Sequence, residues 1–290
     1  MISHSERTNH LLEVATNISL IPASEANSIS YIPRFLANIS FPARRIAGNE
    51  YTRQNGRYKL HLLSPSDIGL PYGTYPRQLI IHLTTRAKIT GNSEIFLGSS
   101  QSQFLKSLGL KNSGGKTGSL RAVKDQTKRL LASTILWSES TDSSWNQESM
   151  RIAQKVSMVW EPFNSSKWEA CLKLDHTFFS DILNSAIPID QRVIDVCSHY
   201  PLAIEIYCWL THRYYRMPQS QLITWEQLAN QFGNIYSRRS HFKDKFIMAL
   251  DRVSLLYQKA RFSTNTKGLV LYASPPHVSP KTAEGFYNSV

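Results

Sequence analysis

The residues best suited to chemistry lie in the stretch from Ser113 to Trp137, where basic side chains gather on a predicted helix. Three glycines end whatever precedes it, and Ser119 can cap a new helix that begins near Leu120. Apolar or small positions recur at three- and four-residue spacing: Leu120, Val123, Thr127, Leu130 and Leu131. Five basic residues accompany a single acidic one, Asp125: Lys116, Arg121, Lys124, Lys128 and Arg129. A helix face that only confers solubility usually mixes its signs, so the pattern favours an anionic partner, with a solubilising face as the alternative.

A second helix of the same character is predicted near the C-terminus. It opens in the run Ser237 to Lys245 and keeps helical spacing of apolar residues to Tyr257: Phe242, Phe246, Leu250, Val253 and Leu256. Six basic residues accompany two acidic ones between Arg238 and Lys259. The segments 260–263 and 268–272 then predict a β-hairpin with Lys267 near its tip.

The elements around the two basic helices follow the same order. In the first half a helix over 77–90, a strand over 94–97 and a helix over 101–108 closed by Gly109 precede the basic helix. Strands over 133–139 and 154–160, joined by a polar loop, follow it. In the second half a helix over 202–215 and a Thr224-capped helix over 225–232, stopped by Gly233, precede the basic helix and its hairpin. Few identities align, so the repetition is one of architecture.

This order of elements is that of a winged helix, in which the third helix enters the major groove and the hairpin touches the DNA backbone. The sequence therefore predicts an α+β fold with two tandem winged-helix domains, predominantly helical with β-hairpin wings. The expected division is a partly flexible N-terminal segment (1–60), a first domain (61–165), a second domain (166–278) and a C-terminal tail (279–290). Within it, 11–20 is a candidate short helix, 58–63 a strand, and the strand over 168–174 and the helix over 177–184 open the second domain.

Composition agrees with a polyanion as partner. The 290 residues carry a formal net charge of +12 and have a pI near 9.6, which favours nucleic acid or an acidic membrane surface. No apolar run approaches the roughly 18 residues of a membrane-spanning helix, so a cytoplasmic protein without membrane association is expected. The three widely spaced cysteines predict reduced thiols, with neither a disulfide nor a metal site.

Motifs for catalysis fit poorly. The run GLKNSGGKT resembles a phosphate-binding loop, but Gly109 lies one residue too far from Gly115, and a helix precedes the run where a strand is required. The tyrosines of His212-Arg213-Tyr214-Tyr215 would need a metal held by clustered histidines to act as nucleophiles in DNA nicking, and no His-x-His pair exists. Binding without catalysis or a cofactor is therefore the expectation.

With these residues in place, the chain resembles the plasmid-encoded RepA replication initiators of Gram-negative bacteria. The resemblance covers roughly 70–278 and is carried by an ordered set of short motifs: 72–77 (YGTYPR), 83–85 (LTT), 104–110 (FLKSLGL), 114–119 (GGKTGS), 204–211 (IEIYCWLT), 232–233 (FG), 242–243 (FK), 268–271 (GLVL) and 274–278 (SPPHV). It implies binding to repeated double-stranded DNA at a plasmid origin, help in opening the duplex, recruitment of host replication proteins such as a helicase or initiator, and repression of its own gene as an open question. A homodimer stays open, and the first 60 residues lie outside the match.

The residues expected to contact DNA come from the two basic helices and the second hairpin. Arg121 with Lys124, and Arg239 with Lys243, are the candidates for base edges, whereas Lys116 and Ser119 beside a helix start suit phosphate. The complete set is Lys116, Thr117, Ser119, Arg121, Lys124, Lys128, Arg238, Arg239, Ser240, His241, Lys243, Lys245 and Lys267. Two rival functions remain at this point: a transcriptional repressor without an initiation role, which needs the same surface, and an origin-nicking enzyme.

Overall fold

The computed structural model describes residues 4–38, 40–110, 119–159, 168–233 and 239–287, and the chain divides into two units. Unit 1 combines Met1–Ser30 with Ile187–Val290, and unit 2 is Tyr31–Ala186. Both mix helices and strands, as the predicted α+β class requires. The units divide the chain differently from the expected domains, since the segment 168–186 belongs to unit 2 and the N-terminal residues are shared between the units.

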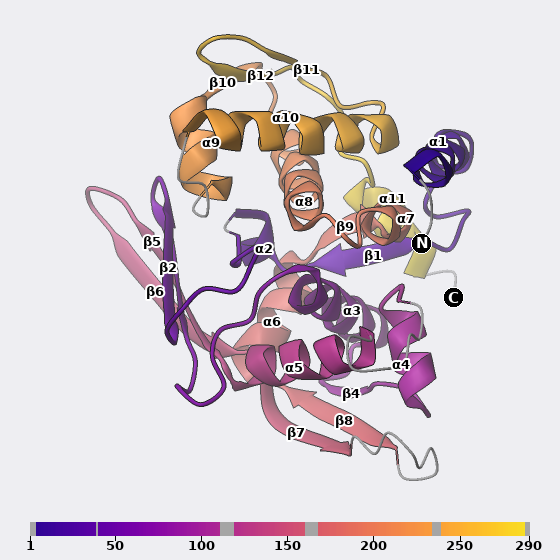
Figure 1. Cartoon of the computed structure of the whole chain (residues 1–290), viewed down its shortest axis with the longest axis vertical. Coiled ribbons are helices and arrows are strands. Elements are labelled where there is room, and N and C mark those ends of the chain that lie inside the picture. The colour runs from indigo at the N-terminus through magenta and orange to yellow at the C-terminus, as the bar shows by residue number, and fades with distance from the viewer. Residues whose placement is uncertain (1–3, 39, 111–118, 160–167, 234–238, 288–290) are drawn as a thin grey trace. The chain divides into compact units, whose positions relative to one another are not determined.

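Unit 2 contains two antiparallel sheets and five helices among its described residues. Four strands form one sheet in the order β2-β3-β5-β6: β2 (Glu50–Asn55), β3 (Tyr58–Leu63), β5 (Thr134–Ser140) and β6 (Trp145–Arg151). Three strands form the other in the order β4-β8-β7: β4 (Glu94–Phe96), β8 (Glu169–Leu174) and β7 (Ala153–Val159). The helices are α2 (Arg34–Asn38), α3 (Thr74–Thr90), α4 (Gln101–Ser107), α5 (Ser119–Ala132) and α6 (His176–Ser185) (Figure 1).

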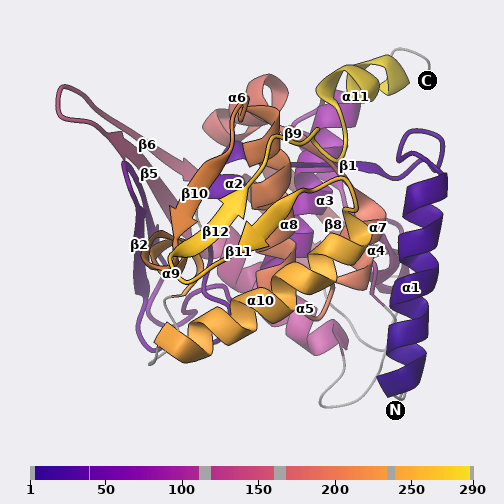
Figure 2. The ribbon, with the colours of Figure 1, turned by 90° about the horizontal axis from the view of Figure 1, so that it is seen from above.

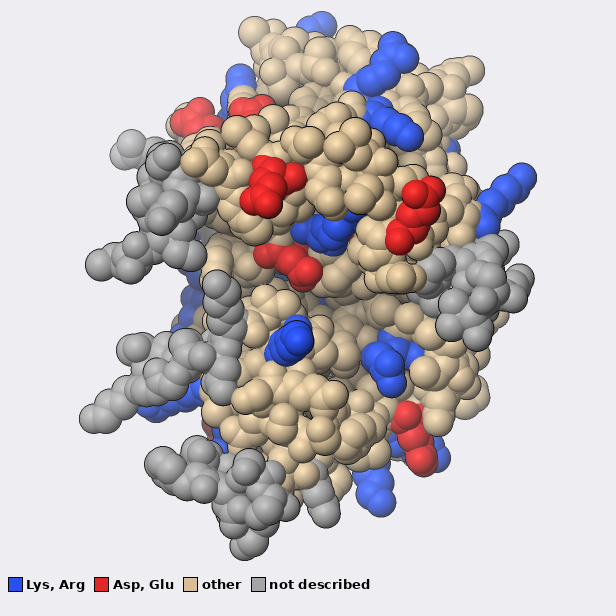
Figure 3. Space-filling model, turned by 90° about the vertical axis from the view of Figure 1, so that its right-hand side faces the viewer, with Lys and Arg blue, Asp and Glu red and all other residues tan. Residues whose placement is uncertain are grey.

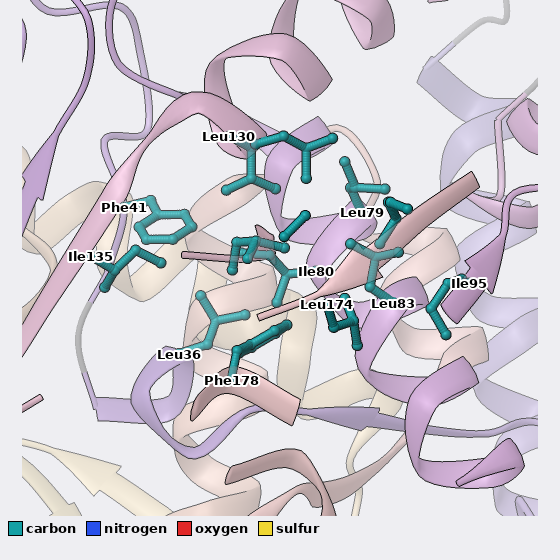
Figure 4. Close-up of a cluster of buried hydrophobic side chains, with 14 of the residues drawn as sticks. Leu36, Phe41, Leu79, Ile80, Leu83, Ile95, Leu130, Ile135, Leu174 and Phe178 are labelled. Carbon is teal, nitrogen blue, oxygen red and sulfur yellow. The ribbon is translucent and has the colours of Figure 1, made fainter. Parts of the chain in front are cut away.

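One hydrophobic core holds unit 2 together. Side chains from the helices α2, α3, α5 and α6 converge with those of both sheets, and most are no more than a few per cent exposed. Figure 4 labels a part of this core: Leu36, Phe41, Leu79, Ile80, Leu83, Ile95, Leu130, Ile135, Leu174 and Phe178. Because α3 and α5 pack on this core with their apolar faces, the remaining face of α5 turns to solvent.

Unit 1 is built around the buried helix α8 (Pro201–Tyr215) and the long helix α10 (Arg239–Leu256), which pack on each other. Its sheet has the order β10-β12-β11, with β10 (Gln221–Thr224), β12 (Gly268–Leu271) and β11 (Phe262–Thr264), and Figure 2 shows β12 between its neighbours. The other helices are α1 (His4–Leu20), α7 (Gln191–Val196), α9 (Trp225–Phe232) and α11 (Pro280–Tyr287). A short pairing of β1 (Ile29–Ile32) with β9 (Ile187–Asp190) brings the N-terminal segment to this part of the chain.

Helix ends follow the local sequence. Ser100 caps α4 by accepting the Gln103 N–H, and Gly109 ends the turn after it with a φ of 70°, while the N–H groups of Gly109 and Leu110 donate to Lys106 and Leu105. Thr224 and Gln227 form a reciprocal capping box on α9. The cap predicted at Thr224 and the left-handed glycine predicted at Gly109 are confirmed.

The two units repeat one succession of elements. In unit 2 it is α3, β4, α4, α5, β7 and β8, and in unit 1 it is α8, β10, α9, α10, β11 and β12. In each set the strand that comes last in the chain lies in the centre of the sheet and pairs antiparallel with both others. β8 pairs with β4 and β7, and β12 pairs with β10 and β11. We call these sets the unit 2 module and the unit 1 module.

The hairpin predicted after α5 is wrong in its partners. The supposed polar loop contains a strand, β6, and β6 pairs with β5 throughout, from Thr134 opposite Arg151 to Ser140 opposite Trp145. β7 instead pairs with β8, which had been expected to open the second domain. The sequence of β6 does not alternate between apolar and polar residues, because six of its seven residues are exposed and only Met150 is buried.

Candidate nucleic-acid interface

Helix α5 has the two faces that the sequence predicted. Val123, Thr127 and Leu130 are buried, whereas Arg121, Lys124 and Lys128 are exposed at a spacing that places them on one side of the helix. Arg129, in contrast, makes contacts within the fold. Its Nε donates to Asp125 Oδ2 at 2.8 Å, and its guanidinium lies 5.8 Å from the ring centre of Tyr72. Three basic side chains of α5 therefore face solvent.

The start of this helix carries further predicted contacts. Ser119 is the first residue of α5. Lys116 and Thr117 lie outside the described residues, as does most of the glycine-rich run that resembles a phosphate-binding loop.

Helix α10 has the same construction. All five predicted apolar positions are at most 1% exposed, while Ser240, His241 and Lys245 face solvent. Arg239 begins the helix, and Arg238 lies outside the described residues. Lys243 differs from the other basic residues, because its Nζ lies over the ring of Trp225, 4.8 Å from the ring centre.

The turn between β11 and β12 holds Lys267 in a defined backbone conformation. Asn265 Oδ1 accepts the N–H groups of Lys267 at 2.8 Å and Gly268 at 3.0 Å, and the Asn265 N–H donates to the Gly268 carbonyl at 2.9 Å. The Lys267 carbonyl accepts the N–H of Trp225 at 3.1 Å, which attaches the turn to the start of α9. The Lys267 side chain is exposed at the tip, as the sequence predicted.

In unit 2 the sheet β4-β8-β7 presents basic residues that sequence reasoning missed. Lys155 lies opposite Lys173, and Lys173 lies opposite Glu94 in the neighbouring strand. Phe96, 57% exposed, follows on the same face opposite the exposed Cys171. The sequence signal for this face is that the polar positions Cys171 and Lys173 flank the apolar Leu172 in β8. From the sequence, this strand was expected in the second domain.

The two tyrosines of the His212–Tyr215 run differ, because Tyr214 packs inside the fold whereas Tyr215 is 57% exposed. Tyr214 is buried, its hydroxyl donates to the Arg261 carbonyl at 3.0 Å, and burial raises its pKa to about 12. The Arg213 guanidinium lies 5.6 Å from the ring centre of Trp209. No group of three His, Cys, Asp or Glu side chains suited to a metal occurs in the part of the chain that the structure describes.

Two other motifs of the family resemblance also hold the fold. Arg77 is fully buried, and its guanidinium donates to the carbonyls of Phe41, Pro42 and Gly73. His277 Nδ1 lies 2.8 Å from the Tyr207 hydroxyl, and its ring stacks on Tyr257. Burial lowers the pKa of His277 to about 4, so near neutral pH the imidazole is uncharged.

A family model described as plasmid encoded RepA protein matches residues 70–227, which is more than half of the chain. The chain belongs to this RepA replication initiator family. The match runs from just before α3 into α9, so it includes the whole unit 2 module and the first part of the unit 1 module. The family resemblance proposed from the short motifs is thereby confirmed.

Two solved structures share the fold of this RepA-family chain. Domains 2–3 of RctB, residues 155–483, match with a TM-score of 0.51 at 13% identity, covering 82% of this chain and 94% of that one. A selenomethionine derivative of domains 2 and 3 of RctB matches with a TM-score of 0.52 at 13% identity, over 83% and 94%. No curated protein gives a significant match. At this identity the RctB structures support the arrangement of elements alone.

The surface of the RepA-family chain is not uniformly basic. On the face in Figure 3, Lys and Arg side chains lie scattered among Asp and Glu side chains. Among the side chains that the structure describes, Arg121, Lys124 and Lys128 are exposed on α5, and Lys245 is exposed on the first half of α10 beside the exposed Asp244.

No helix among the described residues is both long and apolar enough to span a membrane.

Proposed function

We propose that the protein is a plasmid replication initiator that binds repeated double-stranded DNA at its origin through two winged helices. The observation that carries this proposal is the repeated module, in which the third helix exposes basic residues and a three-stranded sheet closes the fold. In a winged helix the third helix enters the major groove, so Arg121, Lys124 and Lys128 of α5 and the basic start of α10 would lie in successive grooves.

The sheets take the part of the wings in this proposal. Lys267 at the β11–β12 turn would contact the DNA backbone in the unit 1 module. In the unit 2 module Lys155 and Lys173 on the outer face of β4-β8-β7 would do so, in place of the hairpin expected from the sequence. The arrangement needs neither a cofactor nor a catalytic residue.

The first experiment measures fluorescence anisotropy of duplexes from the DNA flanking the protein's own gene, against scrambled duplexes, over a salt series. A specific-to-random affinity ratio on the order of a thousandfold or more is expected from base readout. Equal and steeply salt-dependent affinity for both duplexes would contradict sequence-specific binding.

Initiation and recruitment need separate measurements. A plasmid that carries only the origin should replicate when the protein is supplied in trans, and failure to replicate alongside specific binding would favour a repressor. Host replication proteins and a second copy of this chain are the proposed protein partners, to be sought on origin DNA. Supercoiled origin plasmid incubated with the protein and magnesium should show no protein-linked nick, because the proposal assigns no nucleophile.

A further inference from the structure

Trp225 joins three parts of the unit 1 module. It is the first residue of α9 and is 8% exposed. Its backbone N–H donates to the Lys267 carbonyl, and its indole Nε1–H donates to the Asn265 carbonyl at 3.0 Å. Its ring meets Phe246 of α10 edge-on, with 6.2 Å between the ring centres. One rigid side chain therefore connects the turn of the sheet to the helix expected to enter the groove.

The same ring lies beneath the ammonium of Lys243. A cation over an indole face is attracted by the ring quadrupole. Such an ammonium acts as a point charge for phosphate, whereas bidentate base reading suits the planar guanidinium of arginine. The position over Trp225 therefore favours a phosphate contact for Lys243, although the sequence suggested that it reads a base.

The turn that carries Lys267 has little freedom of its own. Its Asn265 side chain bonds two backbone N–H groups within the turn. A Cβ on Gly268 would lie 2.1 Å from the Ile223 carbonyl oxygen, so the strand can approach β10 this closely only with glycine. With the turn internally fixed, the two bonds to Trp225 act together with the pairing of β12 and β10 to set its position against α9.

We propose that Trp225 is a positioning residue that makes Lys243 and Lys267 act as one phosphate-binding unit. This inference rests on the proposed function, because it assumes that the unit 1 module binds duplex DNA. It goes further by assigning Lys243 and Lys267 to phosphates of the DNA backbone. It also makes the contribution of Lys267 to binding depend on the Trp225 indole, over which Lys243 lies.

A double-mutant cycle on the full-length chain tests the coupling. Lys267→Ala should weaken binding to cognate and scrambled duplexes alike, by about tenfold for a charged hydrogen bond, and reduce the salt slope by about one. Trp225→Phe keeps an aromatic ring but removes the indole N–H, and in this background Lys267→Ala should cost less than about threefold. Trp209→Phe is the matched control, because Trp209 is a buried tryptophan of the same unit that packs on Phe232. In that background the cost of Lys267→Ala should stay near tenfold.

A second variant loosens the turn from its exposed side. Asn265→Ala removes the Oδ1 acceptor and leaves Trp225 in place, so it should reduce the cost of Lys267→Ala in the same direction even if Trp225→Phe fails to fold. An equal cost of Lys267→Ala in all backgrounds would overturn the inference and leave the proposed function standing. A Lys243→Ala loss confined to the cognate duplex would also overturn it. A native chain that binds neither duplex would overturn both.

Discussion

In both modules a tryptophan indole hydrogen-bonds between the sheet and the region of the second helix. The tryptophan lies on the helix in unit 1 and next to a strand in unit 2. In unit 1 the indole of Trp225 belongs to a helix and donates to the Asn265 carbonyl of the sheet turn. In unit 2 the indole of Trp168 directly precedes β8 and donates to the Gly98 carbonyl, ahead of α4, at 2.7 Å. Trp168 also packs on Phe104 of α4, with 6.0 Å between ring centres. Each module therefore has an indole-to-carbonyl hydrogen bond between its sheet and its second helix region, made by tryptophans at non-equivalent positions.

The modules also differ in what lies between the third helix and the sheet. In unit 1 a short segment joins α10 to β11. In unit 2 the hairpin β5–β6 intervenes and continues the sheet of β2 and β3 (Figure 1). The unit 2 module is thus joined to an additional sheet, and β7 is separated from α5 by 20 residues, 133–152. Comparison of the modules is most informative where the elements match, in the helices and the three-stranded sheets.

The largest expected effect tests whether both modules depend equally on their cores. Phe104→Ala in α4 and Phe246→Ala in α10 each remove a fully buried ring, so each should lower the free energy of unfolding by about 3–5 kcal/mol. Urea denaturation of the full-length chain measures the change. Met248→Ala is the control, because Met248 is 63% exposed and its loss should change stability by less than about 0.5 kcal/mol. A tolerated change at either phenylalanine would break the equivalence of the modules.

A smaller effect distinguishes the two sheets. Gly268 faces Thr224 where β12 approaches β10, and a Cβ there meets backbone, so Gly268→Ala should destabilise the chain by about 3 kcal/mol. In the β4–β8 pairing every residue carries a side chain, as in the pair of Phe96 with Cys171. Cys171→Ala, at an exposed strand position, should cost less than about 0.5 kcal/mol. Equal urea midpoints for the two variants would contradict the close approach at Gly268.

DNA binding should respond in both modules to loss of an arginine. Arg121→Ala and Arg239→Ala are each expected to cost about 1–3 kcal/mol on the cognate duplex and to relax one base preference, because an arginine can bond O6 and N7 of guanine together. Anisotropy with single-base variants of the duplex measures both effects. Lys59→Ala, an exposed change on β3 outside the modules, should leave affinity unchanged. If only one arginine matters, a single module reads the sequence.

The smallest effect concerns pH and involves one histidine in each unit. Burial lowers the pKa of both His82 and His277 to about 4, from an ordinary value of 6.5. Between pH 6.5 and pH 4 the unfolded chain binds protons that the folded chain does not, so stability is lost as the pH falls through this window. Each histidine should contribute about 1 kcal/mol per pH unit, below the full linkage value because both side chains are partly exposed.

Urea midpoints at pH 7 and pH 5 measure this loss. His82→Gln should remove the share that comes from unit 2 and flatten the pH dependence, with His277 providing the remainder. A pH dependence that is unchanged in the variant would show that His82 is not protonated on unfolding in this range.

Much of this protein follows from local sequence. The cap at Thr224, the left-handed Gly109 and the buried stripes of α5 and α10 depend on residues within one or two turns of each other, and all three were predicted. The strand over 58–63 was also predicted with its bounds. The basic faces of both helices follow from the same periodicity, since burying one face of a helix leaves the other to solvent.

Only the tertiary structure decided which strands pair and which residues surround the candidate interface. β7 pairs with β8 across an interval of sequence, and nothing local distinguishes that partner from β5. The stacking of Lys243 on Trp225, and the face shared by Lys155 and Lys173, likewise join residues from separate elements. The physical reason is that helix periodicity and caps act over a few residues, whereas strand partners are chosen by long-range burial that no local pattern records.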